Sequence, residues 1–249
     1  MTYFPEKPYN VAVIGAASGI GKAAAQFLAG EGVRVFCIDR DSDGARATAL
    51  AIGSLASGHS FDVTDPERAG KVMGEIIEKA GQLHGLVNCA GIVGKTNIKA
   101  HEVDLADFDA VYAINLKGAL VVSKAVLPHM IERKYGRILH VASIAGKEGN
   151  AGMAAYSATK AGLIGLVKVM GKDYAETGIT VNALAPAVIR TPMVTALPEA
   201  QVKYMTDKIP MHRCGELAEA AAMIAWIVSP ACSFTTGFTF DLTGGRAVY

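Results

Sequence analysis

The chain has 249 residues, 51% of them hydrophobic, so it can bury a large core without disulfides or structural metals. Its 24 Lys and Arg against 23 Asp and Glu leave a formal charge of +1, which argues against nucleic acid or an anionic membrane as the main partner. These values indicate a protein that acts on small molecules. Because no linker-like change in composition occurs, we expect one α/β domain over 1–249.

The cysteines and the N-terminal residues indicate the cellular compartment of the protein. Cys37, Cys89, Cys214 and Cys232 are far apart, with no CxxC pair and no Cys/His cluster, so we expect neither a disulfide framework nor a metal site. The first ten residues lack the pattern of a signal peptide. No apolar run is expected to reach membrane-spanning length. We therefore expect a cytoplasmic protein.

Short β-rich runs alternate with helical patterns along the chain, which is typical of βαβ units and a parallel sheet. The predicted strands are 10–15, 33–39, 59–63, 85–90, 136–143, 180–186 and 238–244. The predicted helices are 19–30, 43–56, 66–80, 105–133, 153–176 and 216–228. Several strands are apolar throughout, as in a sheet covered on both faces. We thus predict a doubly wound parallel sheet of about seven strands with helices on both faces.

Two segments are longer than plain connections require. Residues 92–104 follow the fourth strand, and 187–215 follow the sixth. Open α/β sheets bind ligands beyond the carboxyl ends of their strands, where both segments lie. We expect 187–215 to be a lid or a binding segment.

A glycine-rich turn joins the first predicted strand to the first predicted helix. Gly15, Gly19 and Gly21, with Ser18 and Ile20 between them, have the spacing G-x3-G-x-G. Such glycines let the backbone turn sharply and let a pyrophosphate approach the free N–H groups at the helix N-terminus. Alone, the motif is also compatible with an ordinary βα turn.

Asp39 makes a dinucleotide site the better interpretation. It ends the second predicted strand, where a carboxylate can accept hydrogen bonds from the adenosine ribose and repel a 2′-phosphate. Arg40 could instead tolerate that phosphate, so we expect NAD to be preferred and NADP to remain possible. Asp62 and Val63 fall where adenine would lie. Three further residues would line the floor between the two halves of the cofactor, namely Asn88, Ala90 and Gly91.

Tyr156 and Lys160 lie four residues apart in a run of small and apolar residues. This spacing puts both side chains on one face of a helix. A half-buried Tyr beside a Lys that extends to water would be the structural alternative.

Together these motifs resemble the short-chain dehydrogenase/reductase family over essentially the whole chain. The resemblance depends on G-A-A-S-G-I-G at 15–21, N-C-A-G at 88–91, P-A-V-I-R-T at 186–191, Asn115, Ser143 and the Tyr156-x3-Lys160 pair. It implies a Rossmann-type fold, with the cofactor half at about 8–92 and the catalytic and substrate half at about 93–249.

The resemblance also implies the catalytic roles. Tyr156 would exchange a proton with the substrate hydroxyl while hydride moves to or from nicotinamide. Lys160 would favour the phenolate and bind the nicotinamide ribose, and Ser143 would hold the substrate oxygen. Asn115 would lie at a bend in its helix and hold a relay water. Pro186, Ile189 and Thr191 would contact the nicotinamide end of the cofactor.

The chain departs from the family pattern at three positions. Ile14 and Ala187 stand where the family often has Thr and Gly, and Cys89 replaces the common Asn. Ala187 requires a backbone conformation that a residue with a Cβ can adopt. None of the three removes a reacting group.

The substrate is indicated by polar residues around the catalytic helix. Lys147, Glu148, Asn150 and Arg190, with Ser143, Tyr156, Ile144 and the 92–98 loop, would face it. Such a rim suits a sugar or sugar acid, and the stretches 147–168 and 238–247 resemble the branch that acts on sugars and 2-keto-3-deoxy sugar acids. Alternatively, these charges are solvated loop residues.

Two other functions compete with this interpretation. An NADPH-dependent 3-oxoacyl-thioester reductase would favour a basic residue near the glycine turn, where this chain has Ser18 and Asp39. A dinucleotide-sensing binding protein would not need the intact Ser143, Asn115, Tyr156 and Lys160 set. The sequence therefore favours an NAD-dependent oxidoreductase.

The helices 105–133 and 153–176 are apolar on more than one face, so each needs a second packing partner. The family resemblance implies a homotetramer, with the C-terminal GGRAVY near a neighbouring subunit.

Overall fold

A computed structural model describes residues 3–247 and 249, apart from the Met193 side chain. Within this part of the chain, seven parallel strands form one sheet in the order β3-β2-β1-β4-β5-β6-β7. The strands are β1 (Asn10–Ile14), β2 (Arg34–Asp39), β3 (Ala56–Ser60), β4 (Gly85–Asn88), β5 (Gly136–Val141), β6 (Ile179–Pro186) and β7 (Thr239–Leu242). The strand order reverses between β1 and β4, which is where doubly wound sheets bind ligands. The predicted fold class is confirmed.

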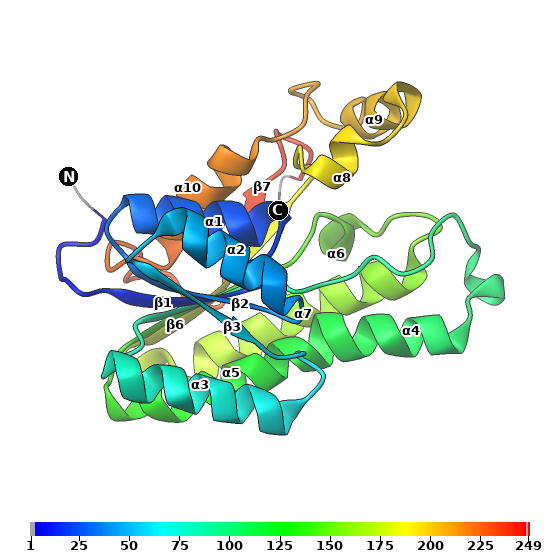
Figure 1. Cartoon of the computed structure of the whole chain (residues 1–249). Coiled ribbons are helices and arrows are strands. Elements are labelled where there is room, and N and C mark those ends of the chain that lie inside the picture. Colours follow the sequence, from blue (N-terminus) through cyan, green and yellow to red (C-terminus); the bar gives the residue numbers. More distant parts are fainter. Residues whose placement is uncertain (1–2, 248) are drawn as a thin grey trace.

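Helices cover both faces of this sheet (Figure 1). The longer ones are α1 (Gly19–Gly30), α2 (Ser42–Ile52), α3 (Pro66–Ala80), α4 (Leu105–Tyr112), α5 (Gly118–Glu132), α7 (Ala154–Asp173) and α10 (Leu217–Ile227). Short helical segments are α6 (Ala145–Glu148), α8 (Pro192–Thr195), α9 (Glu199–Thr206), the 3₁₀ turns η1 (Ala100–Glu102) and η3 (Ala175–Thr177), and the π-helical η2 (Ala113–Lys117). Figure 1 places α1, α2 and α10 on one face and α3, α5 and α7 on the other.

The side chains of the central strand β1 pack into two hydrophobic cores, one on each face of the sheet. Val11 and Val13 pack with α1 and α10, whereas Ala12 and Ile14 pack with α3, α5 and α7. All four are buried because successive side chains of a strand point to opposite faces. The apolar run predicted a strand covered on both sides, and its side chains are buried on both faces of the sheet.

The third strand lies three residues before its predicted position. The prediction 59–63 relied on Phe61 and Val63, but the strand is the polar stretch Ala56–Ser60, paired in parallel with β2. It is an edge strand of intermediate burial, so its sequence needs no apolar alternation. Phe61 and Val63 instead follow the strand and pack into the core. The predicted helix 43–56 also ends earlier, at Ile52, because Gly53 adopts a positive φ of 92°.

The predicted helix 105–133 is one long helical run that passes through the π-helical η2. By length and composition, Leu105–Glu132 meets the criteria for a membrane span, with a mean hydropathy of 1.5, which the sequence prediction had excluded. The run lies against the sheet and supplies Val122, Val126 and Met130 to the core. A core helix of this kind passes the same test.

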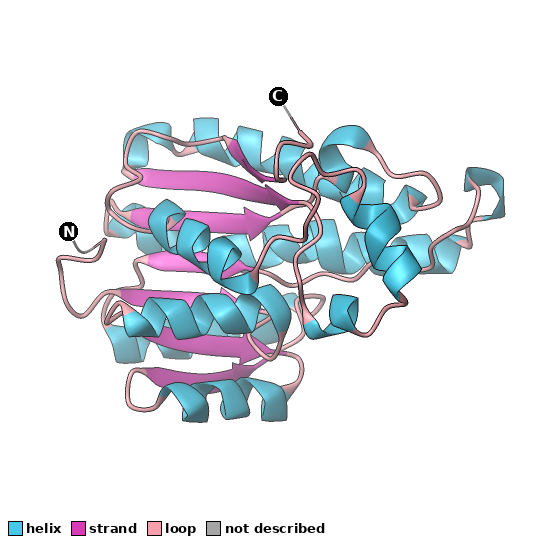
Figure 2. Cartoon of the chain, turned by 90° about the horizontal axis from the view of Figure 1, so that it is seen from above, coloured by secondary structure: helices cyan, strands magenta, loops and turns pink. Residues whose placement is uncertain are grey.

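All strands point to one end of the molecule, and the connections at that end carry the site. Figure 2 shows the arrowheads directed toward the side where loops and short helices gather. Both long connections, after β4 and after β6, lie there. This end therefore collects residues from distant parts of the sequence.

Candidate active site

The glycine turn between β1 and α1 brings backbone atoms unusually close together. Gly15 has a φ of +81°, and a Cβ there would lie 3.0 Å from Ala90 N. A Cβ on Gly21 would lie 2.1 Å from Gly15 O, so α1 packs directly on the turn. Ser18, the residue before α1, makes no side-chain cap, which leaves the first N–H groups of the helix free to bind an anion.

A cavity of about 430 Å³ opens beside this turn. Its wall includes the predicted cofactor residues Gly15, Ser18, Asp39, Arg40, Asp62, Val63, Ala90 and Gly91. Asp39 is held in place because its Oδ2 accepts a hydrogen bond from Ala17 N and its Oδ1 accepts one from Asp41 N, both at 3.0 Å. Each carboxylate oxygen can accept a further hydrogen bond from a ribose hydroxyl.

Asp62 lies at the far side of the cavity, just after β3. Its Oδ1 accepts hydrogen bonds from Thr64 N at 2.9 Å and from Thr64 Oγ1 at 2.7 Å. These bonds, with the charge of Arg40, lower the pKa of the Asp62 carboxyl. The carboxylate is thus held ionised, with Oδ2 free to accept from an amino group such as that of adenine.

The floor of the cavity is supported by a buried polar network. Asn88 Oδ1 accepts from Ala90 N at 3.2 Å, and Asn88 Nδ2 donates to His140 Nδ1 at 3.1 Å. His140 Nε2 therefore carries the proton and donates to Ser123 Oγ at 3.0 Å, which itself donates to Ala119 O at 2.8 Å. Burial lowers the pKa of His140 to about 3, so the ring is neutral.

The side chains of Lys160 and Asn115 both lie close to Gly91. A Cβ on Gly91 would lie 3.2 Å from Asn115 Oδ1 and 3.4 Å from Lys160 Nζ. Asn115 lies in η2, the interruption that corresponds to the predicted bend, and binds both Ile92 N (2.8 Å) and Ile92 O (2.9 Å). Lys160 is buried and donates to Val141 O at 2.7 Å; its burial lowers its pKa to about 8.

Tyr156 and Ser143 face each other across the site. Ser143 is close enough to Tyr156 to lower the pKa of its phenol, and Ser143 Oγ accepts a hydrogen bond from Ala145 N at 3.1 Å. The Lys160 ammonium lies 5.7 Å from the centre of the Tyr156 ring. In the protein alone, burial raises the pKa of Tyr156, and Ser143 lowers it only in part. This direction is opposite to the expected one, because Lys160 is bonded to Val141 O rather than to the phenol.

The segment after β6 passes close to the glycine turn. Pro186 O accepts from Ile144 N at 3.0 Å, which ties β6 to the loop that carries Ser143. Thr191 Oγ1 accepts from Val194 N at 3.3 Å and so caps α8, and a Cβ on Gly19 would lie 3.7 Å from Thr191 Cγ2. Ile189 is buried; among the described residues its N–H has no hydrogen-bond partner. Contact of Pro186, Ile189 and Thr191 with the nicotinamide end of the cofactor stays a prediction.

The departures from the family pattern are accommodated. Ile14 is buried in the core beside α3, α5 and α7. Ala187 is absent from the positive-φ residues of the described chain, so its Cβ causes no strain. Its N–H donates to Leu242 O at 3.0 Å.

The predicted substrate residues are mostly paired with other side chains. Lys147 Nζ donates to both carboxylate oxygens of Asp241, at 3.0 and 2.9 Å, and its side chain is only 8% exposed. Arg190 Nε donates to Glu216 at 3.0 Å on the surface. Neither presents a free charge to the catalytic hydroxyls, so their contact with a substrate stays a prediction.

Glu148 and Asn150 lead to a residue that the sequence prediction missed. Both accept hydrogen bonds from Arg246, at 2.9 Å and 3.1 Å. Arg246 belongs to the C-terminal stretch that was expected near a neighbouring subunit, and here it contacts its own chain. Only its unusual position after a double glycine, Gly244–Gly245, hinted at a role.

The residues present fit a dinucleotide. A turn without Cβ atoms, free N–H groups at α1, and a fixed carboxylate at Asp39 match a pyrophosphate and a ribose in the order in which a dinucleotide presents them. The nicotinamide end of a dinucleotide bound in this order would lie toward Tyr156 and Lys160.

Comparisons with known proteins agree with this geometry. A family model described as short chain dehydrogenase matches residues 9–202. A 2-dehydro-3-deoxy-L-rhamnonate dehydrogenase (NAD(+)) of Sphingomonas sp. (strain SKA58) is 41% identical over 239 residues, covering 95% of this chain and 94% of the relative. A 3-oxoacyl-acyl-carrier-protein reductase of Thermotoga maritima is 36% identical, covering 95% and 96%.

A solved structure gives the same result for the fold. The crystal structure of gox2181 superimposes with a TM-score of 0.95 at 29% identity, covering 100% of this chain and 99% of its own. The family model alone spans well over half of the chain. The chain therefore belongs to the short-chain dehydrogenase/reductase family.

Proposed function

We propose that the protein is an NAD-dependent dehydrogenase that transfers hydride between nicotinamide and a secondary alcohol or ketone of a 2-keto-3-deoxy sugar acid. The observation that carries this proposal is the 41% identity, over 95% of the chain, to a dehydrogenase named for such an acid and for NAD(+). The polar, charged residues between Ser143 and the C-terminus support it, because an acyl chain would need an apolar channel there.

The cofactor site supports NAD. The free N–H groups of Ser18, Gly19 and Ile20 would bind the pyrophosphate. Asp39 would accept hydrogen bonds from the ribose diol and would repel a 2′-phosphate at the same place. Arg40 is exposed beside it, so NADP remains a weaker alternative.

The remaining cofactor contacts follow from position. Asp62 and Val63 would contact adenine, and Asn88, Ala90 and Gly91 would form the floor. Pro186, Ile189 and Thr191 would contact the nicotinamide end, Ile189 through its N–H. Tyr156 and Lys160 would bind the nicotinamide ribose.

The chain's own residues supply the proton chemistry. When bound, the oxidised cofactor supplies a hydride acceptor and a positive charge near the Tyr156 phenol. Tyr156 takes the proton of the substrate hydroxyl as a general base, and Ser143 holds the same oxygen by a hydrogen bond. Since burial alone raises the pKa of Tyr156, positive charge from Lys160 and the cofactor is needed to make the phenolate accessible.

Lys160 and Asn115 complete the proton path in this proposal. Lys160, whose pKa is about 8, carries its charge at neutral pH and lies within reach of the phenol ring. Asn115 fixes the backbone at Ile92, and its Nδ2 also donates to Thr159 Oγ1 at 3.3 Å. A water held beside Asn115 would connect Lys160 to solvent.

The test is a turnover assay on purified protein with a panel of aldonic acids, 2-keto-3-deoxy sugar acids and neutral sugars, each with NAD or NADP. Formation of reduced cofactor with a 2-keto-3-deoxy sugar acid and NAD is expected. Silence on that panel, together with NADPH-dependent reduction of a 3-oxoacyl thioester, would replace the proposal with the thioester reductase to which 36% identical relatives point. Cofactor binding without any turnover would favour the dinucleotide-sensing alternative.

We further propose a cytoplasmic homotetramer. Exposed apolar side chains on the helices of one face, including Leu120 on α5 and Val169 on α7, support packing against another copy. Sedimentation at micromolar concentration tests the assembly, and a monomer would refute it.

A further inference from the structure

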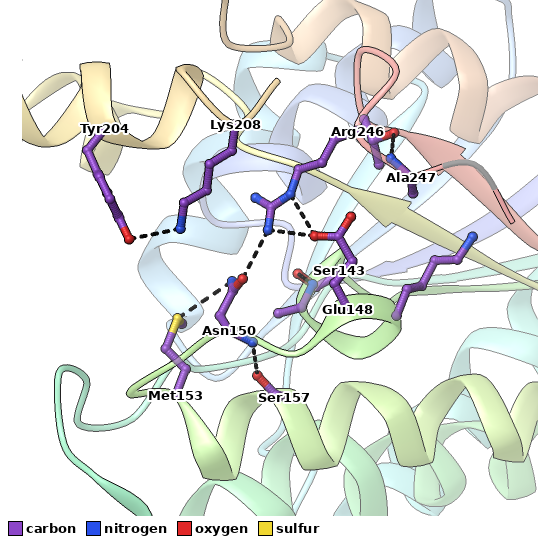
Figure 3. Close-up of polar contacts among 12 residues, drawn as sticks. Ser143, Glu148, Asn150, Met153, Ser157, Tyr204, Lys208, Arg246 and Ala247 are labelled. Atoms are coloured by element: carbon purple, nitrogen blue, oxygen red, sulfur yellow. Dashed lines mark hydrogen bonds and ion pairs between the residues drawn. The ribbon is translucent and has the colours of Figure 1, made fainter. Parts of the chain in front are cut away.

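A second polar cluster lies beside the catalytic hydroxyls, built from parts of the chain that are far apart in sequence. Arg246 comes from the C-terminal segment, Tyr204 from α9 and Lys208 from just after it, Glu148 from the end of α6, and Asn150 from the loop before α7. Figure 3 shows Lys208 directed toward Tyr204 and Arg246 directed toward Glu148 and Asn150, with Ser143 drawn beside Glu148. The catalytic roles proposed above use none of these five residues.

Arg246 is held firmly but is not saturated. Its Nε donates to Glu148 Oε2 at 2.9 Å, and its Nη2 donates to Asn150 Oδ1 at 3.1 Å and lies 2.8 Å from Glu148 Oε2. The Arg246 side chain is only 11% exposed. A guanidinium has five N–H groups, and among the described residues no hydrogen bond involves Nη1. Nη1 of this fixed, nearly buried cation therefore keeps its donor capacity.

Lys208 adds a second positive charge to the cluster. Its Nζ donates to Tyr204 Oη at 2.9 Å and lies 4.2 Å from the centre of the Tyr204 ring. The charges of both Lys208 and Arg246 lower the pKa of the Tyr204 phenol, so the three groups are electrostatic neighbours. Among these five residues, Glu148 pairs with Arg246, and Lys208 contacts the Tyr204 phenol, so the five side chains carry two positive charges and one carboxylate.

The cluster is fixed relative to the reacting groups. Asn150 N donates to Ser157 Oγ at 3.1 Å, and Ser157 is the residue after Tyr156. Glu148 is the last residue of α6, which begins two residues after Ser143. An anion bound to Nη1 of Arg246 would thus be held at a set position from the hydroxyls of Tyr156 and Ser143.

We propose that Arg246, assisted by Lys208, binds the carboxylate of an acidic substrate and so determines which hydroxyl of the chain of carbons reaches Tyr156. Because Nε and Nη2 are occupied by Glu148 and Asn150, the substrate carboxylate would accept a charge-assisted hydrogen bond from Nη1, which is stronger than a bond between neutral groups. Glu148 and Asn150 hold Arg246 in position. The inference rests on the proposed function. It adds to that function how the sugar acid is bound, namely by its carboxylate.

Kinetics on a matched pair of substrates test the role of Arg246. The pair is the 2-keto-3-deoxy sugar acid found in the turnover panel and the methylamide of the same acid, which has no charge. Arg246→Gln is expected to raise KM for the acid about 10- to 100-fold and to leave KM for the amide within about twofold. A merely structural role would change both substrates alike, and that result would overturn the proposal.

Two further variants distinguish a loss of substrate binding from a loss of folding. Arg246→Lys keeps the charge and should recover part of the lost affinity for the acid. Lys203→Gln is a matched control, because Lys203 lies on α9 but pairs with Asp207 at 2.8 Å outside the cluster. It should leave KM for the acid unchanged. Thermal unfolding of each variant shows that it is folded.

Glu148→Gln gives an effect of opposite sign. Gln can still accept from Arg246 Nε, but it lacks the negative charge that repels a nearby anion, so KM for the acid should fall about two- to fivefold, with no change for the amide. A rise in KM for both substrates would show that Glu148 and Arg246 form only a structural ion pair.

A binding titration separates this inference from the proposed function. Gluconate and glucitol differ in a carboxylate against a hydroxymethyl group, and each is titrated into the protein in the presence of NAD. Gluconate should bind the wild type at least tenfold more tightly than glucitol, and Arg246→Gln should remove that difference. If no sugar acid is oxidised, the proposed function fails and the titration alone decides the anion site. Equal binding of gluconate to both proteins would then overturn the site.

Discussion

The cofactor side and the substrate side of this molecule are built by different means. On the cofactor side, the turn at Gly15–Gly21 and the carboxylate of Asp39 belong to neighbouring parts of one βαβ unit. On the substrate side, Arg246 reaches Glu148 and Lys147 reaches Asp241, pairs that are 98 and 94 residues apart. The first region is fixed by backbone packing, and the second by ion pairs that join α6 to β7 and to the C-terminal segment.

This difference has a chemical consequence. A dinucleotide has constant parts, so a rigid backbone with free N–H groups serves every member of the family. Substrates differ, and side chains on loops can be exchanged without disturbing the sheet. In the proposal above, substrate choice depends on contacts such as Arg246 with Asn150, which no local pattern reveals.

The largest effect is expected at Tyr156, where the two regions meet. Tyr156→Phe removes the hydroxyl proposed to take the substrate proton, and kcat should fall about 10³-fold because general base catalysis is lost. NAD affinity, measured by fluorescence titration, should change little. The exposed Tyr112, replaced by Phe, is the control. A fall of less than tenfold in kcat would show that another group takes the proton.

The sequence was sufficient to predict the positions of site residues that are set by periodicity and spacing within one helix or strand. Asp39 ends β2 as predicted, and Tyr156 and Lys160 share a face of α7, because period and spacing determine both. The third strand was misplaced because burial comes from its neighbours: a polar edge strand carries no apolar signal.

The substrate side was predicted only in outline. Lys147, Glu148 and Asn150 were placed near the substrate from their position before the catalytic helix, yet their partners Asp241 and Arg246 were not foreseen. Pairing across such separations depends on how the C-terminal segment crosses the sheet end, and a single sequence has no period that encodes it.

Gly21→Ala tests the rigidity assigned to the cofactor side. The added Cβ would lie 2.1 Å from Gly15 O, so the protein should lose about 3 kcal/mol of unfolding free energy and bind NAD weakly. Gly74→Ala on α3 meets nothing within 4 Å and should be neutral or slightly stabilising, because Ala favours a helix interior. Urea unfolding measures both variants. Equal stability of the two would contradict the close packing of α1 on the turn.

The buried His140 tests the floor of the cofactor cavity through pH. Its folded pKa of about 3 lies below the unfolded value near 6.5, so between these pH values the unfolded chain binds a proton that the folded protein does not. Stability is therefore complete above about pH 6.5 and falls as the pH drops, by about 2 kcal/mol at pH 5 from this residue alone. His140→Gln should remove that part of the slope, whereas His101→Gln, on an exposed turn, should not. Unfolding curves from pH 7 to pH 4.5 measure the difference, and parallel slopes for His140→Gln and wild type would contradict a neutral, buried ring.

Asp39 should show the smallest effect, because it selects between two cofactors that share every other contact. Asp39→Asn keeps only one of the hydrogen bonds that Ala17 N and Asp41 N donate, because the amide NH2 that replaces the other oxygen cannot accept, and it removes the charge that repels a 2′-phosphate. KM for NAD should rise about tenfold, since a neutral amide accepts ribose hydrogen bonds more weakly, and KM for NADP should fall with Arg40 next to it. Asp43→Asn, an exposed residue of α2 paired with Arg46, is the matched control and should leave the ratio of the two KM values unchanged. If Asp39→Asn also leaves that ratio unchanged, cofactor choice is made elsewhere, and the cofactor side would depend on loop side chains as the substrate side does.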